Sequence, residues 1–369
     1  MKIASLDLKR QYESIREEID KAVLEVISSQ LYILGPYVEA FERSMAKFCR
    51  VKHAIGISSG TDAILIALMA CGVKRGDEVI TTPFTFFATG SSIARLEAVP
   101  VFVDIDPSTY NIDVNKIAGA VTKKTKVILP VHLYGQCADM DAILQVAREH
   151  KLMVVEDAAQ AIGAVYKGGQ AGTLGDLGCF SFYPTKNLGG CGDGGLVASN
   201  DDSLAELVNI LRVHGSKQRY YHSHIGINGR LDALQAAILS VKLKYLDEWS
   251  EKRRLIASYY SAHLEGLPIR LPVIAPYNTH IFHQYVIAVS KRDALRSYLG
   301  QQGVESAIYY PVPLHVQQCF EYLGYKRGDF PESERASNEV LALPIFPEIT
   351  QEEQDFVIGH VKKFFKSAP

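Results

Sequence analysis

The stretch LMVVED (Leu152–Asp157) decides the fold class, because a short apolar run that ends on a carboxylate is typical of a buried strand in a parallel sheet. Similar runs recur through the first half of the chain and alternate with stretches of helix length. The predicted strands are His53–Ser59, Asp77–Thr82, Val99–Ile105, Lys126–His132, Leu152–Asp157 and Gly195–Asn200. This alternation predicts an α/β fold whose mostly parallel sheet is covered by helices on both faces.

The pattern changes in the last third of the chain. One face of a long helix is indicated by apolar residues at spacings of three and four: Leu231, Leu234, Ile238, Val241 and Tyr245. Beyond it the sequence predicts a strand, a helix and a closing helix with a capping-box pair: His283–Ser290, Arg292–Gly300, and Thr350 with Glu353. We therefore expect a large domain over residues 1–247, including an N-terminal helix, and a smaller C-terminal α+β domain over residues 248–369.

The bulk composition excludes several classes of protein. The 369 residues carry a net charge of -2, which gives no general attraction to nucleic acid or to an anionic membrane. The polar N-terminus is not a signal peptide, and no apolar run reaches the roughly 20 residues that span a bilayer. Six scattered cysteines without a CxxC pair favour a reducing compartment. We expect a soluble, cytoplasmic protein that acts on neither nucleic acid nor membranes.

A lysine stands in an unusual context in the stretch SFYPTKNLGGCGDGG (Ser181–Gly195). Five of the nine residues that follow Lys186 are glycines. Glycines let the backbone approach a bulky group or adopt conformations that are closed to other residues. The pattern therefore indicates that Lys186 is held against something large.

Two further polar features follow predicted strands. Asp157 stands at the end of its strand, with Gln160 three residues later, where ligands bind in open α/β sheets. Ser59, Gly60 and Thr61 lie between a strand and a helix, where backbone N–H groups can bind a phosphate. Taken alone, the first feature is equally compatible with a helix N-cap, and the second with an ordinary turn.

An aromatic pair completes the set. Phe86 or Phe87, after another predicted strand, offers a face for a planar ring, although a core role explains that segment as well. A phosphate cradle, an aromatic face, a carboxylate and a lysine are together what pyridoxal 5'-phosphate needs. The lysine forms a Schiff base with its aldehyde, and the acid keeps the pyridine nitrogen protonated. The sequence thus predicts that Lys186 faces an aldehyde.

Other chemistries lack their motifs. The sequence contains no GxxxxGK[ST] phosphate loop, no GxGxxG after the first strand, and no GxSxG elbow. His222 and His224 have no second cluster of ligands at a matching spacing, so we expect no metal. A non-catalytic regulatory protein is disfavoured by the complete set of cofactor-binding features.

The sequence resembles the sugar-nucleotide aminotransferases of the DegT/DnrJ/EryC/StrS type, which have the aspartate aminotransferase fold. The resemblance covers nearly the whole chain and rests on the segments YILGPYVEAFE, SSGTDAILIAL, DEVITTPFTFFAT, PVFVDIDPSTYNID, PVHLYGQCADMD, VVEDAAQAIGA, GDLGCFSFYPTKNLG, GINGRLDALQAAIL and YYPVPLH. It implies that Lys186 carries the cofactor, Asp157 pairs with its pyridine nitrogen, Gln160 contacts its phenolic oxygen and Phe86 stacks on its ring.

The resemblance also implies how the phosphate is bound. Gly60, Thr61 and Ser181 are expected to bind it within one chain, and Asn228 of GINGR is expected to reach it from a neighbouring subunit. An active site shared in this way implies a homodimer. One branch of the family has histidine at the lysine position and removes a sugar hydroxyl, so Lys186 favours transamination over that dehydration.

The implied reaction moves an amino group from L-glutamate to carbon 3 of a nucleotide-linked 3-keto sugar, with pyridoxamine 5'-phosphate as the intermediate form. The segment SQLYILGP is similar to the corresponding segment of enzymes that aminate carbon 3 of the sugar, rather than carbon 4. The loop GSKQRYYHSH, with Arg219 before His222, is similar to enzymes for UDP-linked N-acetylated sugars. A dTDP-linked 3-keto-6-deoxyhexose remains the alternative. Such amines enter lipopolysaccharide or other glycans.

The remaining expected sugar contacts are Tyr183 and, in the YYPVPLH segment, Tyr309, Tyr310 and His315. Relatives of the carbon-3 group frequently have histidine where this chain has Tyr309, which leaves the exact sugar open. Packing beside the cofactor loop explains Tyr183 equally well.

Overall fold

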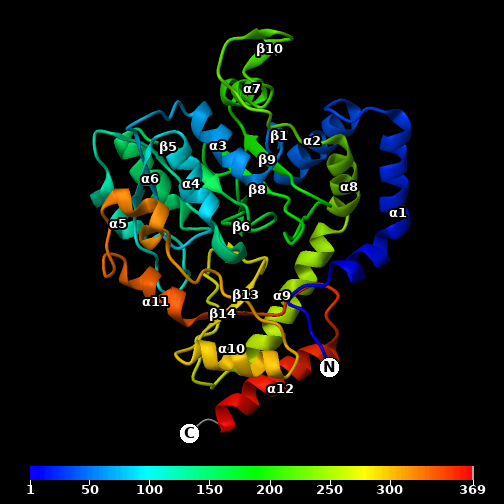
Figure 1. The fold of residues 1–369 in the computed structure, drawn as a ribbon, viewed down its shortest axis with the longest axis vertical. Coiled ribbons are helices and arrows are strands. Elements are labelled where there is room, and N and C mark those ends of the chain that lie inside the picture. Colours follow the sequence, from blue (N-terminus) through cyan, green and yellow to red (C-terminus); the bar gives the residue numbers. More distant parts are fainter. Residues whose placement is uncertain (368–369) are drawn as a thin grey trace.

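The computed structural model describes residues 1–367 and is built around a seven-stranded sheet of order β1-β9-β8-β5-β4-β2-β3 (Figure 1). The strands in that order are β1 (His53–Ile57), β9 (Gly195–Ser199), β8 (Leu177–Ser181), β5 (Met153–Asp157), β4 (Thr125–Ile128), β2 (Glu78–Thr81) and β3 (Val99–Phe102). Neighbours from β8 to β3 are parallel, whereas β9 is antiparallel to both β8 and β1. The predicted α/β fold with a mostly parallel sheet is confirmed.

Both faces of the sheet are covered, because alternate residues of each strand point to opposite sides. Val154 packs into one hydrophobic cluster and Val155 into another. The covering helices are α2 (Pro36–Cys49), α3 (Gly60–Ala70), α4 (Phe87–Arg95), α5 (Val114–Ala120), α6 (Met140–His150), α7 (Asp202–Leu211) and α8 (Ala233–Leu243). The clusters divide these helices into two layers, with α3, α4 and α7 in one and α2, α5, α6 and α8 in the other.

Strand β8 is missing from the predicted set of strands. Its sequence, Leu177–Ser181, includes Gly178, and glycine weakens a strand signal. A Cβ at Gly178 would lie 1.9 Å from the carbonyl oxygen of Gly172. The close backbone contact therefore requires glycine at this position, and the same glycine weakened the sequence signal for the strand.

The single long helix predicted after residue 230 is wrong in detail. Helix α8 ends at Leu243, and α9 (Leu246–Leu264) begins after a break at Lys244 and Tyr245. The N–H of Tyr245 donates to the carbonyl of Lys242 at 3.0 Å, which is the tighter bond of a 3₁₀-type turn. The apolar spacing continued across this turn and therefore did not reveal it.

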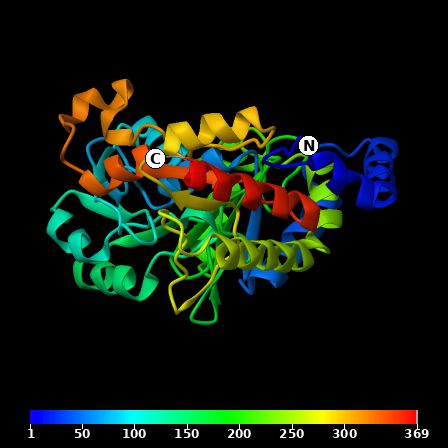
Figure 2. The same ribbon diagram turned by 90° about the horizontal axis from the view of Figure 1, so that it is seen from below.

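A separate hydrophobic cluster fills the C-terminal part. It packs α9 with β13 (Tyr285–Ala288), β14 (Val340–Leu343), α10 (Arg292–Gln301) and α12 (Gln351–Ser367). Seen from below, α12 lies between α9 and α10 (Figure 2). Ile3 also belongs to this cluster, with its N–H bonded to the carbonyl of Gly303 at 2.8 Å. The start of the chain thus contacts the C-terminal part, and a domain boundary near residue 247 stays a prediction.

The predicted capping box at the start of α12 is confirmed. The N–H of Glu353 donates to Thr350 Oγ1 at 3.2 Å, and the N–H of Thr350 donates to Glu353 Oε2 at 2.9 Å. Arg10, on α1 (Leu8–Ser29), donates to both carboxylate oxygens of Glu353. The cap therefore also holds the first helix against the last.

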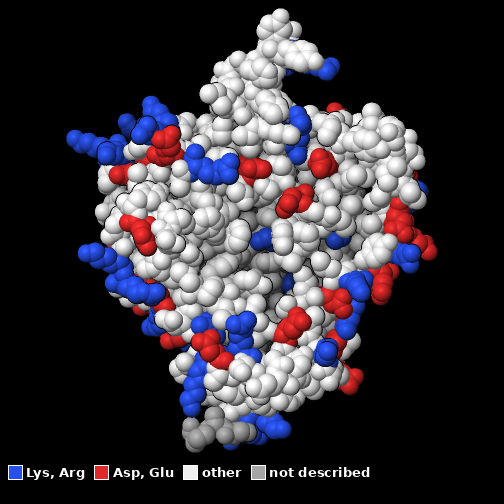
Figure 3. Space-filling model, in the orientation of Figure 1, with Lys and Arg blue, Asp and Glu red and all other residues white. Residues whose placement is uncertain are grey.

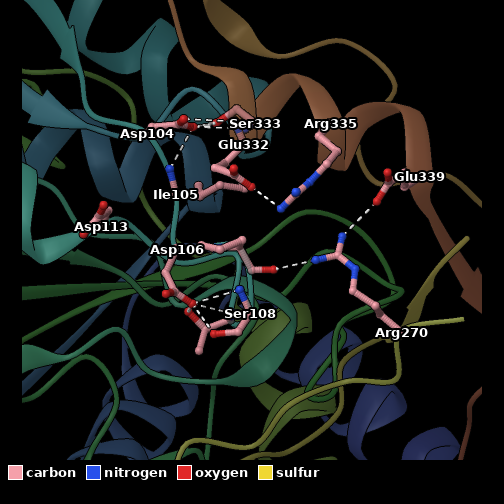
Figure 4. A network of polar contacts seen from close by, with 12 residues as sticks. Asp104, Ile105, Asp106, Ser108, Asp113, Arg270, Glu332, Ser333, Arg335 and Glu339 are labelled. Atoms are coloured by element: carbon pink, nitrogen blue, oxygen red, sulfur yellow. Dashed lines mark hydrogen bonds and ion pairs between the residues drawn. The ribbon is translucent and has the colours of Figure 1, made fainter. Parts of the chain in front are cut away.

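Polar contacts join the C-terminal part to the sheet (Figure 4). Asp104, after β3, accepts the backbone N–H groups of Glu332 at 3.0 Å and Ser333 at 2.9 Å in the first turn of α11 (Pro331–Glu339). Nearby, Arg270 donates to Glu339 at 2.9 Å and to the carbonyl of Pro107 at 3.2 Å. These contacts fix the position of the C-terminal part over the carboxyl ends of the strands.

The remaining elements lie around this core. They include α1 at one flank and a two-stranded hairpin, β10 (Ser216–Gln218) with β11 (Tyr221–His222), which projects beside α7 (Figure 1). A three-stranded sheet combines β12 (Asn278–Thr279), β6 (Val165–Tyr166) and β7 (Gly169–Gln170). Within residues 1–367, no helix is long and apolar enough to cross a membrane.

Candidate active site

A cavity of about 590 Å³ lies between the carboxyl ends of the strands and the C-terminal part. The loops after β1, β2, β5 and β8 form one wall, and residues from α9 onward form the other. The face drawn in Figure 3 carries most of its charged side chains near the rim, with a few Lys or Arg side chains in the middle. The residues that line the cavity include Ser59, Gly60, Thr61, Phe86, Asp157, Gln160, Ser181, Tyr183, Lys186, Arg253, His283, Tyr309 and Tyr310.

Asp157 ends strand β5 and is only 4% exposed. Its Oδ2 accepts the hydroxyl of Thr89 at 2.7 Å, and its Oδ1 accepts the N–H of Ala159 at 3.2 Å. Burial raises the pKa of the Asp157 carboxyl, whereas these two donors and the charge of Lys186 act in the opposite direction. The result is a rigidly held carboxylate that gains stability from a cationic partner.

Lys186 lies on the loop after β8 and shares the cavity with Asp157. Its backbone N–H donates to the carbonyl of Tyr183 at 2.8 Å, which forms a tight turn. Burial lowers the pKa of the Lys186 amine to about 8, and the charge of Asp157 opposes that shift. A substantial fraction of this amine is therefore neutral near physiological pH, and only the neutral amine attacks a carbonyl.

A cradle for an anion forms at the start of helix α3. The Ser59 hydroxyl caps the helix by accepting the N–H of Asp62 at 3.1 Å. The N–H groups of Gly60 and Thr61, in the first turn, have no acceptor within the helix by position. A Cβ at Gly60 would lie 2.6 Å from the Cβ of Ser181, so only glycine permits this approach. The helix N-terminus and the serine together suit a phosphate.

The aromatic and amide side chains complete the wall. Gln160 accepts the N–H of Tyr134 at 2.8 Å and donates to the Tyr310 hydroxyl at 2.8 Å, which fixes the orientation of its amide. The ring of Phe86 is 55% exposed and lies 6.1 Å from the ring of Tyr310. An exposed phenylalanine that lines a cavity is available to stack on a planar ligand. Tyr183 and Tyr309 line the same cavity.

Three predicted site residues do not line the cavity of their own chain: Arg219, Asn228 and His315. Arg219 lies on the exposed turn between β10 and β11, with its guanidinium 5.0 Å from the ring centre of Tyr220. Asn228 pairs with Val213 in an isolated antiparallel bridge. Neither position brings its side chain to the cavity that holds Lys186.

The expectation that His315 faces the sugar is not supported by its position. The side chain is 2% exposed, its Nε2 lies 3.1 Å from Glu334 Oε1, and its ring packs against Phe330. His315 therefore lies outside the cavity lining, with its ring against Phe330 and its Nε2 beside Glu334 of α11.

Sequence reasoning missed three residues of the site. Thr89 supports Asp157, and its hydroxyl lies 2.9 Å from the hydroxyl of Thr85, which precedes helix α4. Two threonines after a predicted strand were an available signal. Arg253 and His283 gave no signal in the sequence. For Arg253, the stretch EKRR (residues 251–254) has the composition of a solvated helix face, yet Arg253 is 3% exposed and lines the cavity.

The fold and the cavity together define a pyridoxal-phosphate-dependent enzyme. A buried carboxylate suits a protonated ring nitrogen, a lysine with a lowered pKa suits an aldehyde, and the Gly60–Ser181 cradle suits the phosphate. Pyridoxal phosphate, when bound, supplies an electron sink for a carbanion next to the amine. Among residues 1–367, no group of three or more His, Cys, Asp or Glu is arranged to hold a metal ion.

The chain belongs to the DegT/DnrJ/EryC1/StrS aminotransferase family, whose model matches residues 13–362. This family is pyridoxal-phosphate-dependent, and the chain is therefore an aminotransferase of that class.

Several curated relatives match nearly end to end. The chain is 53% identical to the "Pleiotropic regulatory protein" of Geobacillus stearothermophilus, over 99% of both chains. It is 42% identical to the "UDP-N-acetyl-3-dehydro-alpha-D-glucosamine 3-aminotranferase" of Acidithiobacillus ferrooxidans, over 95% of both chains. It is 41% identical to the "dTDP-3-amino-3,4,6-trideoxy-alpha-D-glucose transaminase" of Streptomyces venezuelae, over 98% of this chain and 96% of the relative.

Solved structures agree with the fold in detail. S. venezuelae DesV in complex with a ketimine intermediate superposes with a TM-score of 0.98 at 40% identity, over 100% of both chains. NtdA of Bacillus subtilis with bound cofactor PMP superposes with a TM-score of 0.92 at 36% identity, over 99% of this chain and 86% of that one.

Proposed function

We propose that the protein transfers the amino group of L-glutamate to carbon 3 of a nucleotide-linked 3-keto sugar, with a UDP-linked N-acetylated 3-keto hexose as the substrate. The observation that carries the proposal is the cavity that holds Lys186 and Asp157 together. Glutamate leaves as 2-oxoglutarate, and the sugar ketone becomes an amine. The names of the Acidithiobacillus and Streptomyces relatives support a carbon-3 amination of a sugar nucleotide.

The roles of the side chains follow from their chemistry. Lys186 moves a proton between the amino-bearing carbon and the cofactor, because its amine is neutral for part of the time near pH 8. Asp157 keeps the ring nitrogen protonated, and Thr89 holds Asp157 in place. Gly60, Thr61 and Ser181 bind the phosphate, and Phe86 and Gln160 hold the ring.

The proposal includes a homodimer whose two active sites are shared. Asn228 and Arg219 do not line the cavity of their own chain, which suits residues that act in a neighbouring site. The hairpin around Arg219 carries exposed aromatic side chains, and Tyr220 is 78% exposed. In a dimer, these residues are available to the sugar nucleotide of the other site.

The nucleotide-linked sugar has a second candidate. A dTDP-linked 3-keto-6-deoxyhexose is the second candidate, since a relative named for a dTDP-linked 3-amino-3,6-dideoxy sugar matches about as well as the UDP-linked one. The regulatory name of the Geobacillus relative does not favour a non-catalytic role here, because Lys186 and Asp157 share one cavity and the chain belongs to an aminotransferase family.

The test is a comparison of two sugars under one set of conditions. The purified protein is incubated with pyridoxal phosphate, glutamate and either UDP-N-acetyl-3-keto-glucosamine or dTDP-3-keto-6-deoxyglucose, and the amino sugar and 2-oxoglutarate are measured by mass spectrometry. Formation of the amino sugar and 2-oxoglutarate in equal amounts from the UDP sugar supports the proposal. Preference for the dTDP sugar would replace the substrate, and 2-oxoglutarate without any amino sugar would overturn the transfer to sugars.

A further inference from the structure

We propose that Lys242 and Gln235 of α8 are positioning residues, which hold the backbone that follows Lys186 and so fix the direction from which its amine reaches the cofactor. This inference rests on the proposed function, because it concerns the proton transfer assigned there to Lys186. Neither of the two residues lines the cavity. The starting observation is that side chains of one helix are bonded to the glycine-rich loop that follows Lys186.

Two hydrogen bonds join this loop to α8. The Nζ of Lys242 donates to the carbonyl of Gly189 at 2.8 Å, and the N–H of Cys191 donates to Gln235 Oε1 at 2.8 Å. Both contacts lie within a few residues of Lys186. The two side chains are about two helical turns apart, so they project from the same side of α8 toward the loop.

The glycines of the loop fit this contact. A Cβ at Gly190 would lie 2.7 Å from Gln235 Oε1, and a Cβ at Gly192 would lie 2.9 Å from Gln235 Nε2. Either added atom would push the amide away from the loop and break its hydrogen bond to Cys191. The two glycines therefore admit the side chain of Gln235, which gives part of the glycine-rich pattern a role within the protein itself.

Lys242 is a costly residue at this position unless its charge is used. Its side chain is 6% exposed, and burial lowers the pKa of its amine, whereas Cys191 and Glu348 oppose that shift. Both of its acceptors are neutral, since besides Gly189 it donates to Gln11 Oε1 of α1 at 3.0 Å. An apolar side chain of the same length would avoid the desolvation cost. Stability alone therefore does not explain the lysine, whereas a charged donor holds a carbonyl more strongly than a neutral one.

The two residues between Lys186 and these contacts are also held. Asn187 donates through Nδ2 to the carbonyl of Ile281 at 3.2 Å. Leu188 is fully buried in the hydrophobic cluster that includes the apolar side of α8. The backbone after Lys186 is thus fixed, and movement is left to the side chain. That arrangement suits a residue that carries the cofactor and then moves a proton, because both tasks need the amine to return to one position.

The first test follows the loop in the cofactor-free protein by hydrogen exchange and mass spectrometry. Gln235→Met and Lys242→Met keep the length of each side chain and remove its hydrogen bond to the loop. The peptide that covers residues 187–195 is expected to exchange about 10-fold faster in both variants. The matched control is Lys244→Met, since Lys244 follows α8 directly but is exposed and pairs with Glu18 at 2.7 Å. Unchanged exchange in both variants would overturn the inference.

Single-turnover absorbance measurements with glutamate then separate positioning from folding. In both variants the maximal rate constant is expected to fall about 10- to 100-fold, because a displaced lysine transfers the proton slowly. The glutamate concentration at half-maximal rate should change less than about threefold, and Tm should fall by less than about 5 °C. The isotope effect with α-deuterated glutamate should rise, since proton transfer then limits the rate more fully. Gln235→Glu keeps an oxygen acceptor for Cys191 and should recover most of the rate.

The opposite results are equally specific. An unchanged rate constant at a temperature where the variants are folded would assign Lys242 and Gln235 to stability alone and overturn the inference, as would an equal loss in Lys244→Met. If Lys242→Met does not fold, equal rates in Gln235→Met and Gln235→Glu would overturn it. If glutamate leaves the absorbance of the wild type unchanged, the proposed donor fails. Unchanged variants beside a reactive wild type overturn this inference alone.

Discussion

The edge of the sheet at Asp157 and the hairpin around Arg219 are built in opposite ways. Asp157 is 4% exposed and held by two hydrogen bonds, on the end of a central strand. The hairpin projects from the body of the protein, and its Tyr220 and Tyr221 are 78% and 69% exposed (Figure 1). Lys186 and Asp157 therefore share one cavity within a single chain, whereas the hairpin does not line that cavity and is proposed to act in the site of a neighbouring chain.

The largest expected effect concerns the lysine. Lys186→Ala should lower turnover by at least about 10³-fold, because no other described side chain in the cavity can replace a neutral amine. Circular dichroism should show an unchanged fold. The control is Lys167→Ala, which removes an exposed lysine paired with Asp141 at 2.6 Å and should leave turnover intact. Substantial turnover by Lys186→Ala would contradict the assignment.

Replacing the carboxylate should have the next largest effect. Asp157→Asn keeps the shape and can still accept the hydrogen bond from Ala159, but a neutral group cannot keep the ring nitrogen protonated. We expect a loss on the order of 10²-fold in the proton-transfer steps, measured by stopped-flow absorbance with glutamate. Asp141→Asn, at an exposed carboxylate, serves as the control. An unaffected rate would mean that the ring nitrogen does not depend on Asp157.

The reactivity of the lysine should depend on pH in a direction that burial sets. Because the pKa of Lys186 is lowered to about 8, the cofactor-free protein should capture pyridoxal phosphate faster as pH rises to about 8, and level off above it. An ordinary lysine would continue to gain reactivity up to about 10.4. In Asp157→Asn the midpoint should fall further, since the charge of Asp157 raises this pKa. Rates of capture across pH, trapped by borohydride, provide the measurement.

The proposed sharing of the site predicts complementation between two defective chains. Asn228→Ala should lower turnover about 10- to 100-fold through loss of a phosphate contact. Co-expressed with Lys186→Ala, it should form mixed dimers in which one site has both residues intact, so that activity returns to about a quarter of the wild type. No recovery in verified mixed dimers would place Asn228 in the site of its own chain.

The smallest effect is expected at the hairpin. Arg219→Ala should raise the KM for the sugar nucleotide about 10-fold, without a change in the donor half-reaction or in Tm. Its side chain contacts the ring of Tyr220 and forms no ion pair within the described chain, so its removal leaves the fold unaffected. Arg16→Ala, at an exposed arginine paired with Asp20, is the matched control. An equal loss in the donor half-reaction would contradict a role confined to the sugar.

The two regions also differ in how far the sequence could predict them. Strand-end residues such as Asp157 and Gly60 were predictable, because a parallel sheet brings the ends of its strands to one edge. Lys186 was predictable from its glycine-rich context. The packing of His315 against Phe330 and Glu334, outside the cavity lining, was not predictable because the path of a loop depends on tertiary packing. Arg253 was missed because a charged run on a helix gives no sign of which side chain is buried.

The most direct test of the account is to locate the cofactor on the chain. The purified protein is reduced with borohydride, digested and analysed by peptide mass spectrometry, with Lys186→Ala and Lys167→Ala treated in parallel. The account predicts a pyridoxyl phosphate group on the peptide that contains Lys186, retained in Lys167→Ala and absent from Lys186→Ala. A cofactor on another lysine, or its persistence in Lys186→Ala, would contradict the central claim that this loop holds the aldehyde.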